Sequence, residues 1–325
     1  MEESRKIQSL IEQRKNLDNN LKIKREKIIK SILDEIINAA KKKEVYILGH
    51  KYPDCDSIVS SIILKNILKS KGIEAKFAIL KDEYTYNNED SKLLCDIIEE
   101  MPVILEEYNN NYRYILVDSN DPNQSVEDKN IDYIIGCIDH HIYTGKIKNT
   151  IEIEYASTAL LIYDLFKEEY NFSDKEKELI AYSVMADTEY LASARYTLED
   201  KDIYQKLNVK LDEEKLRKKY FVKTDFNKGI ESVFLEAYKK YERDGIELNK
   251  VAFRVYNDDD KYKEQLKNYM LKKEGIWFAI WVNYENRTTE VFVKINNSKM
   301  KCFKLNYILT SANLIINEII KRKFI

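Results

Sequence analysis

The stretch VYILGHKYPDCDSI, residues 45–58, decides how this chain folds. Its first four residues are apolar, which is the pattern of a short buried β-strand. An imidazole and two carboxylates follow within one turn of chain, at His50, Asp54 and Asp56. Residues 57–71 then carry apolar side chains at helical spacing and stop at a glycine, a helix-ending signal. The stretch therefore predicts a strand that leads through a polar loop into a helix, which is the opening of an α/β domain.

The same alternation of strands and helices continues along the first two thirds of the chain. Apolar patterns predict strands at 75–80, 112–117 and 131–138, and helices at 157–170 and 174–186. Strands that alternate with helices favour a mostly parallel sheet flanked by helices, which binds ligands beyond the carboxyl ends of its strands. The predicted fold class is therefore α/β.

A second, smaller α/β domain is expected after a charged helical connector. Its strands are predicted at 251–256, 277–282 and 290–295, and its helices at 261–273 and 312–320. We divide the chain into an N-terminal helical extension, a catalytic domain, a helical connector and a smaller substrate-binding domain, at 1–44, 45–205, 206–227 and 228–325.

The N-terminal extension shows one continuous pattern. Residues 5–43 carry apolar side chains at helical spacing among Lys, Arg, Glu, Asp and Asn, which predicts one long helix or a helical hairpin. The simplest interpretation is a helix that packs on the following domain. A coiled coil that forms a homodimer is the alternative, although Arg14 and Lys24 interrupt its apolar seam.

Composition restricts the classes of partner. The chain of 325 residues has 54 Lys and Arg and 56 Asp and Glu, a net charge of −2. This balance gives no electrostatic reason to expect nucleic acid or an acidic membrane as a partner. The 4 cysteines form no C-x-x-C pair and suggest no disulfide framework. With no signal-peptide pattern and no apolar run of membrane-spanning length, we expect a cytoplasmic protein.

Acidic and imidazole side chains recur at the ends of the predicted elements. After the first cluster come Asp118 at the end of one strand, residues 139–141 (Asp-His-His) at the end of the next, and Asp187 at the end of a helix. The chain has only 3 histidines, and all of them lie in these clusters. Taken singly, Asp54 could be a helix cap and Asp187 a satisfied polar group at a helix end.

Together, these clusters predict a metal site at one edge of the sheet. Crowded carboxylates repel one another unless protons or cations neutralise them. Imidazole nitrogens with carboxylate oxygens suit Mn, Zn, Co or Fe better than Ca. Two divalent ions roughly 3.5–4 Å apart could polarise a phosphoryl group there and activate a water.

In order, the clusters resemble the four signature motifs of the DHH phosphoesterase superfamily. They are GHKYPDCDSI at 49–58, VDSN at 117–120, DHH at 139–141 and ADT at 186–188. The first motif is similar to the version found in manganese-dependent (family II) inorganic pyrophosphatases. The second domain would then be a divergent DHH-associated C-terminal domain.

The resemblance implies a role for each motif residue. The implied metal ligands are His50 and Asp54 for one ion, Asp56, His140 and Asp187 for the other, and Asp118 as a bridge between them. The implied cofactor is two Mn²⁺ per chain, with Co²⁺ or Mg²⁺ as alternatives.

The resemblance also implies catalytic and substrate-binding residues. Besides Asp118, the catalytic residues would be His141, which faces the substrate phosphate and donates a hydrogen bond or proton, and Asp139, which orients the neighbouring imidazoles. Lys239, in the segment AYKKYE at 237–242, matches a lysine that binds phosphate. A small phosphate anion is therefore the expected partner.

The chain departs from the family pattern at two places. Ser119 stands where the pyrophosphatases carry a histidine. Residues 310–313 (TSAN) stand where they carry Ser-Arg-Lys-Lys, so Ala312 and Asn313 replace two cations that bind pyrophosphate. The substitutes considered from sequence are four cations upstream, Arg287, Lys299, Lys301 and Lys304.

The leading hypothesis from sequence is hydrolysis of inorganic pyrophosphate to two phosphates at a two-metal site. One alternative is a related phosphoesterase that acts on short polyphosphate or on a nucleotide phosphoester, which the missing cations favour. A third is a non-catalytic regulator that keeps the fold. The chain has no Gly-Gly and no histidine after His141, which argues against the oligonucleotide-cleaving branch of the superfamily.

Overall fold

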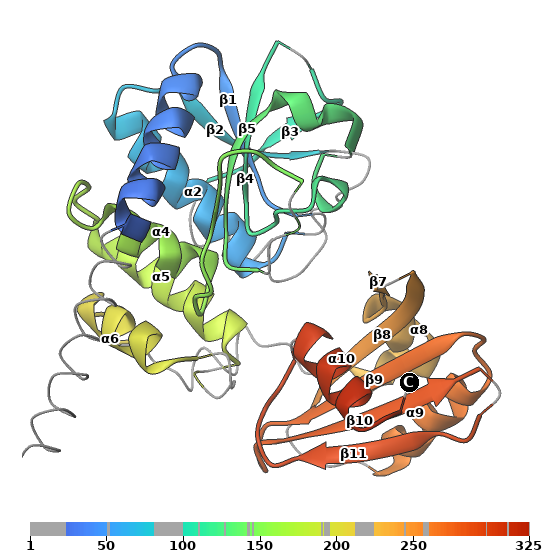
Figure 1. The fold of residues 1–325 in the computed structure, drawn as a ribbon. Helices are drawn as coiled ribbons and strands as arrows, with labels where there is room; N and C mark the ends of the chain where they lie inside the picture. Colours follow the sequence, from blue (N-terminus) through green and yellow to red (C-terminus); the bar gives the residue numbers. More distant parts are fainter. Residues whose placement is uncertain are drawn as a thin grey trace, which may run out of the picture. The chain divides into compact units, whose positions relative to one another are not determined.

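A computed structural model describes residues 24–324 except 51–52, 81–99, 110, 127, 142–143, 145, 190, 192–195, 212–223, 244, 256–259, 297 and 311. The chain divides into two compact units, Met1–Ser183 and Val184–Ile325, each with a sheet of its own (Figure 1). The division falls inside the continuous helix α5 (Asp174–Asp187). The domain limits drawn from the sequence stay predictions.

The N-terminal unit contains a six-stranded sheet in the order β3-β2-β1-β4-β5-β6, and every pair of neighbouring strands is parallel. Its strands are β1 (Val45–Leu48), β2 (Ala75–Leu80), β3 (Val103–Leu105), β4 (Arg113–Val117), β5 (Ile134–Asp139) and β6 (Thr150–Glu152). The predicted parallel α/β sheet is thereby confirmed. The strand order reverses direction between β1 and β4, and this switch point is where sheets of this kind bind ligands.

Helices cover this sheet and position the loops at its edge. They are α2 (Cys55–Ser70), α4 (Thr158–Phe166) and α5; α6 (Leu198–Lys206) follows α5 in the chain and belongs to the second unit. Helices α2 and α4 pack against each other, and α2 also packs against β1 and β2 (Figure 1). Asp54 caps α2 by accepting the backbone N–H groups of Asp56 and Ser57, and Ser157 caps α4 in the same way. Asp54 lies inside the first signature motif, so this motif also fixes where α2 begins.

The N-terminal extension contributes a helix over residues 24–40, drawn in dark blue in Figure 1. Its residues Ile36 and Ala40 are buried. A Cβ atom added at Gly136 of β5 would lie 2.4 Å from Ile36 Cγ1, so helix and strand are in direct contact there. Ile28 is 51% exposed. The predicted helix over residues 5–23 lies outside the described residues.

Two details of the sequence prediction were wrong. The strand expected at 131–138 begins only at Ile134, because Asp128–Tyr133 forms a 3-10 helix, η2. Strand β7, which begins at Lys239, was not predicted from the sequence. The charged residues of β7 suit its position at the edge of the sheet, because one side of an edge strand stays in water.

The C-terminal unit contains a five-stranded sheet in the order β11-β10-β9-β8-β7. Its strands are β7 (Lys239–Arg243), β8 (Ile246–Val255), β9 (Ile276–Asn283), β10 (Thr288–Ile295) and β11 (Lys301–Leu305). Only β8 and β9 pair in parallel, and the other neighbours are antiparallel. The smaller α/β unit predicted from the sequence is confirmed.

Helices pack on both faces of the C-terminal sheet (Figure 1). They are α8 (Ile230–Glu236), α9 (Asp260–Leu271) and α10 (Ala312–Lys321). Residues of α10 share a core with Phe278, Ile280 and Val282 of β9. Helices α8 and α9 share an aromatic core with alternate residues of the same strand, including Trp281. Among the described residues, no helix is both long enough and apolar enough to cross a bilayer.

Candidate metal centre

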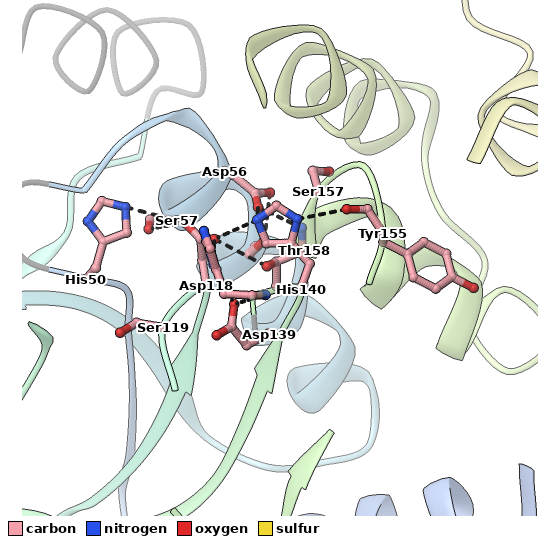
Figure 2. A network of polar contacts seen from close by, with 12 residues as sticks. His50, Asp56, Ser57, Asp118, Ser119, Asp139, His140, Tyr155, Ser157 and Thr158 are labelled. Atoms are coloured by element: carbon pink, nitrogen blue, oxygen red, sulfur yellow. Dashed lines mark hydrogen bonds and ion pairs between the residues drawn. The ribbon is translucent and has the colours of Figure 1, made fainter. Parts of the chain in front are cut away.

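Three neighbouring strands bring the sequence clusters to one edge of the N-terminal sheet. His50 follows β1, Asp118 follows β4 and Asp139 ends β5. Because the three strands are adjacent and parallel, their carboxyl ends lie together. Figure 2 shows the resulting network of imidazoles, carboxylates and hydroxyls, with His140 and Asp118 at its centre.

Asp118 lies between two imidazoles. Its Oδ2 is 3.5 Å from Nε2 of His50, and its Oδ1 is 3.4 Å from Nε2 of His140. These distances are too long for ordinary hydrogen bonds. They are close to the spacing of roughly 3.4 Å between two ligand atoms that each bind one tetrahedral ion at about 2.1 Å. The backbone of Asp118 has φ 57°, a left-handed conformation that Asp adopts more readily than most residues.

Groups that could hold an ion gather around this carboxylate. Among the described residues, three sets of side chains offer ligand atoms within 4.8 Å of one another. The sets are His50 with Asp54 and Asp118, Asp56 with His140 and Asp187, and Asp118 with Asp139, His140 and His141. All six predicted metal ligands belong to these sets, and Asp118 belongs to two of them. Their roles as ligands stay a prediction.

The imidazole of His140 is fixed with one nitrogen available to an ion. Its Nδ1 lies 2.9 Å from the carbonyl oxygen of Tyr155, so this nitrogen carries the proton and donates it. Its Nε2 then faces Asp118 and, at 3.9 Å, Oδ2 of Asp56. Metal-binding histidines commonly donate their second N–H to a backbone carbonyl in this way. The side chain of His140 is buried, so its orientation is set by the protein.

Asp139 holds His141 in place through hydrogen bonds. Its Oδ1 accepts hydrogen bonds from the backbone N–H (3.1 Å) and from Nδ1 (2.9 Å) of His141. Its Oδ2 accepts from Nδ2 of Asn120 at 2.6 Å. Burial acts to raise the pKa of Asp139, but the hydrogen bonds from His141 and the charges of both histidines lower it to about 2. The side chain of His141 is 47% exposed, so Nε2 is the nitrogen left for a ligand.

The carboxylate of Asp56 is fixed at the start of α4. Its Oδ2 accepts from the backbone N–H of Thr158 (2.6 Å), and its Oδ1 from that of Ala159 (2.9 Å). The hydroxyls of Ser183 (2.6 Å) and Ser60 (3.2 Å) also donate to Oδ1. A helix N-terminus stabilises negative charge. Asp56 therefore anchors α2 to α4 and α5 as well as facing His140.

The electrostatics of the cluster favour a bound cation. Burial, followed by the charges of Asp56 and Asp54, raises the pKa of Asp118 well above its usual value. A divalent ion would reverse this effect by neutralising the crowded carboxylates. Imidazole nitrogens and carboxylate oxygens form a donor set that suits Mn, Zn, Co or Fe. The residues present therefore fit a transition-metal site.

The departure at Ser119 leaves this set complete. Ser119 is buried, and Figure 2 shows its side chain pointing away from His140 and Asp118. Its hydroxyl lies 3.4 Å from the carbonyl of Asp121 instead. A serine at this position therefore removes none of the imidazoles or carboxylates described above.

Sequence reasoning missed the residues that hold the ligands in place. Ser57, Asn120, Thr158 and Ser183 donate hydrogen bonds to the three buried carboxylates, and Tyr155 accepts one from His140. Ser57 and Asn120 stand inside the motifs, so the sequence alone could have singled them out. Ser183 and the carbonyl of Tyr155 contact the cluster only through the fold, so no local pattern identifies them.

Comparison with known proteins finds a family match in the N-terminal part of the chain. Residues 44–192 match the sequence profile of the DHH family, N-terminal domain. Over these residues the chain is similar to the DHH family. The match contains all four motifs and the whole candidate metal centre.

Two relatives found by sequence comparison are named as manganese-dependent inorganic pyrophosphatases, one of them as a probable one. The chain is 27% identical over 244 residues to a protein of Clostridium acetobutylicum named as a probable manganese-dependent inorganic pyrophosphatase, covering 70% of this chain and 76% of the relative. It is 27% identical over 214 residues to a manganese-dependent inorganic pyrophosphatase of Methanothrix thermoacetophila, covering 62% of this chain and 67% of the relative.

A solved structure has the same fold. The crystal structure of a candidate family II inorganic pyrophosphatase from Methanococcus jannaschii superposes with a TM-score of 0.63 at 20% identity. The superposition covers 82% of this chain and 95% of the other. It therefore extends beyond the DHH domain into the C-terminal unit and supports the fold of both.

Proposed function

We propose that this chain hydrolyses inorganic pyrophosphate to two phosphates with two divalent ions, Mn²⁺ first among them. The position of Asp118 carries the proposal, because its two oxygens face different imidazoles at 3.5 and 3.4 Å. A carboxylate in this position can serve two ions at once. The relatives named as manganese-dependent pyrophosphatases support the choice of metal and substrate.

The proposed ligands divide between two ions. His50 and Asp54 would hold one, Asp56, His140 and Asp187 the other, and Asp118 both. When bound, such ions polarise phosphoryl oxygens and lower the pKa of a water.

The chain's own residues supply the other functions. Asp139 accepts a hydrogen bond from Nδ1 of His141 and holds the ring at the exposed side of the cluster. In its protonated form the ring donates from Nε2, which suits a phosphate oxygen that gains charge as the bond breaks. Lys239 is the further residue proposed to bind phosphate.

Phosphate release by the metal-loaded protein tests the proposal. Metal-free protein is loaded with Mn²⁺, and phosphate released from pyrophosphate is measured. We expect hydrolysis by the parent and by Ser70→Ala, which removes an exposed hydroxyl at the far end of α2. Asp118→Asn should lose most of the activity and most of the Mn²⁺ binding. An Asp118→Asn variant that binds Mn²⁺ as the parent does would show that the metal site is wrongly placed.

One observation favours a second candidate. Residues 310–313 carry no cation, so the capture of a compact, highly charged anion needs charge from elsewhere. A related phosphoesterase that acts on short polyphosphate or on a nucleotide phosphoester would need less positive charge to capture its substrate. A panel of pyrophosphate, tripolyphosphate and dinucleotides separates the two enzymes. Mn²⁺ binding without hydrolysis of any of these would instead indicate a non-catalytic regulator.

A further inference from the structure

Two lysines face each other at the edge of the C-terminal sheet. Lys239 of β7 is the direct register partner of Lys250 of β8. Directly opposed residues of an antiparallel pair place their side chains on the same face of the sheet, and like charges in that position are destabilising. An anion bound by both ammonium groups would remove the repulsion.

The ammonium group of Lys250 lies beside the segment that lacks the family's cations. Its Nζ donates a hydrogen bond of 3.2 Å to the carbonyl oxygen of Thr310. Thr310 is the first residue of the 310–313 segment and stands two residues before the start of α10. Strand β8 therefore brings a positive charge to the place where residues 310–313 supply none.

A third cation on this face of β8 already has a partner. Arg254 lies four residues after Lys250, and its guanidinium contacts Glu189 through NH2 at 2.9 Å and Nε at 3.2 Å. The hydroxyl of Tyr284 also donates to Glu189. Arg254 therefore anchors the segment after α5 to the sheet. Lys239 is exposed and Lys250 is half-buried.

The same neighbours also shift the pKa of Lys250. Burial, followed by the charges of Lys239 and Arg254, lowers the pKa of Lys250 to about 7, and only Glu189 acts in the opposite direction. A bound anion would raise the pKa of Lys250 again, because a nearby negative charge favours the protonated ammonium group.

We propose that Lys250 and Lys239 together form an anion site of the C-terminal unit that binds one phosphate group of pyrophosphate, with Lys250 replacing the family's C-terminal cations. This inference rests on the proposed function and adds the residue that confers affinity for a compact polyanion. Lysine acts here as a point charge, which phosphate accepts from several directions.

The cations first considered from the sequence lie elsewhere in the unit. Lys301 and Lys304 belong to β11, at the opposite edge of the sheet from β7. Lys301 lies over the ring of Phe324, and Lys304 is 4.0 Å from Glu290. These two residues therefore cannot share one phosphate group with Lys239 in the way that Lys250 can.

Steady-state kinetics of the Mn²⁺-loaded protein on pyrophosphate test the inference. Lys250→Met and Lys239→Met should each raise KM about tenfold to a hundredfold, the loss expected for one charge-assisted hydrogen bond, with a smaller effect on kcat. Lys240→Met is the matched control, because Lys240 lies next to Lys239 on β7 and pairs with Glu247 at 2.6 Å. Its KM should stay near that of the parent.

A binding experiment tests the site without catalysis. Metal-free protein with ¹⁵N-labelled lysines is titrated with pyrophosphate, and the Nζ signals are assigned with the three variants. Saturating shifts of the Lys239 and Lys250 signals would support the site, and unchanged signals would overturn it.

The two proposals fail differently. A parent that hydrolyses pyrophosphate, with Lys250→Met and Lys239→Met keeping its KM, would overturn the lysine site and leave the proposed function intact. Shifts of both signals in a parent without pyrophosphatase activity would support the anion site and overturn the proposed function.

Discussion

The hydroxyl of Ser57 donates a hydrogen bond of 2.7 Å to Oδ2 of Asp118. This is the oxygen that also lies 3.5 Å from Nε2 of His50. The contact joins the first turn of α2 to the end of β4, and both partners are buried. It is possible because residue 49 is a glycine, since a Cβ there would lie 2.6 Å from Cβ of Ser57. Ser57 therefore fixes the direction of the carboxylate at the centre of the cluster.

Removing this hydroxyl should weaken metal binding without removing a proposed ligand. We expect Ser57→Ala to lower Mn²⁺ affinity roughly 10–100-fold, the usual effect of losing a hydrogen bond that orients a metal ligand. Isothermal titration calorimetry should still show two ions per chain. Ser70→Ala, at the exposed end of the same helix, is the matched control. An unchanged affinity in Ser57→Ala would mean that Asp118 is oriented by other contacts.

Asp139→Asn should affect catalysis more than metal binding. Oδ1 of Asp139 accepts two hydrogen bonds from His141, while Oδ2 accepts one from Asn120. An amide has only one oxygen, so the variant must lose the contacts on one side. We expect kcat on pyrophosphate to fall roughly a hundredfold, a typical loss for a displaced acid–base group, with Mn²⁺ stoichiometry unchanged. Asp121→Asn, which removes a carboxylate paired with Lys146, should keep the parent's kcat.

The sequence predicted the parts of the fold that have strong local signals. Strand β2 was predicted with its observed limits of 75–80, and α5 to within one residue. The short edge strands β3 and β6 have three residues each, too few for a period to be recognised. Strand β7 was missed because its sequence, KKYER, is almost entirely charged. An edge strand of this kind is stabilised by its partner in the sheet and not by burial of its own side chains.

The candidate site was also predictable from the sequence only in part. Motif spacing predicted which imidazoles and carboxylates come together, because they follow adjacent parallel strands. It did not predict that Lys250 would meet Thr310, since 60 residues separate them and only the fold brings them together. For the same reason the sequence offered Lys301 and Lys304 as replacement cations, although they belong to the opposite edge strand.

A contact in the N-terminal unit gives a test of how the extension is held. A Cβ at Gly136 would lie 2.4 and 2.5 Å from two side-chain carbons of Ile36. We expect Gly136→Ala to destabilise the protein by about 1–3 kcal/mol through overpacking, measured by urea unfolding. Ile36→Ala removes the clashing atoms, so Gly136→Ala should cost clearly less in that background. Equal costs in both backgrounds would show that the helix over residues 24–40 does not pack on β5.

The last prediction concerns the stability that Lys250 costs the folded protein. Burial and the charges of Lys239 and Arg254 lower its pKa from 10.5 to about 7 in the folded state. Between these values the unfolded chain holds the proton more tightly, so the folded state loses stability as pH falls through this window. The loss is complete below about pH 7. Lys250→Met removes the charge, and in phosphate-free buffer it should raise Tm below pH 7 by roughly 2–4 °C for each kcal/mol recovered.

Three comparisons separate this effect from ordinary repacking. The advantage of Lys250→Met should shrink as pH rises and vanish above about 10.5, where the folded and unfolded lysine are both neutral. Lys240→Met, which removes a lysine paired with Glu247, should show no such gain. Added pyrophosphate should raise the Tm of the parent more than that of Lys250→Met, because a ligand stabilises the state that binds it. A Lys250→Met variant that is less stable than the parent at every pH would contradict the prediction. A gain below pH 7 together with a weaker response to pyrophosphate is the result expected if this lysine is kept for anion binding at the expense of stability.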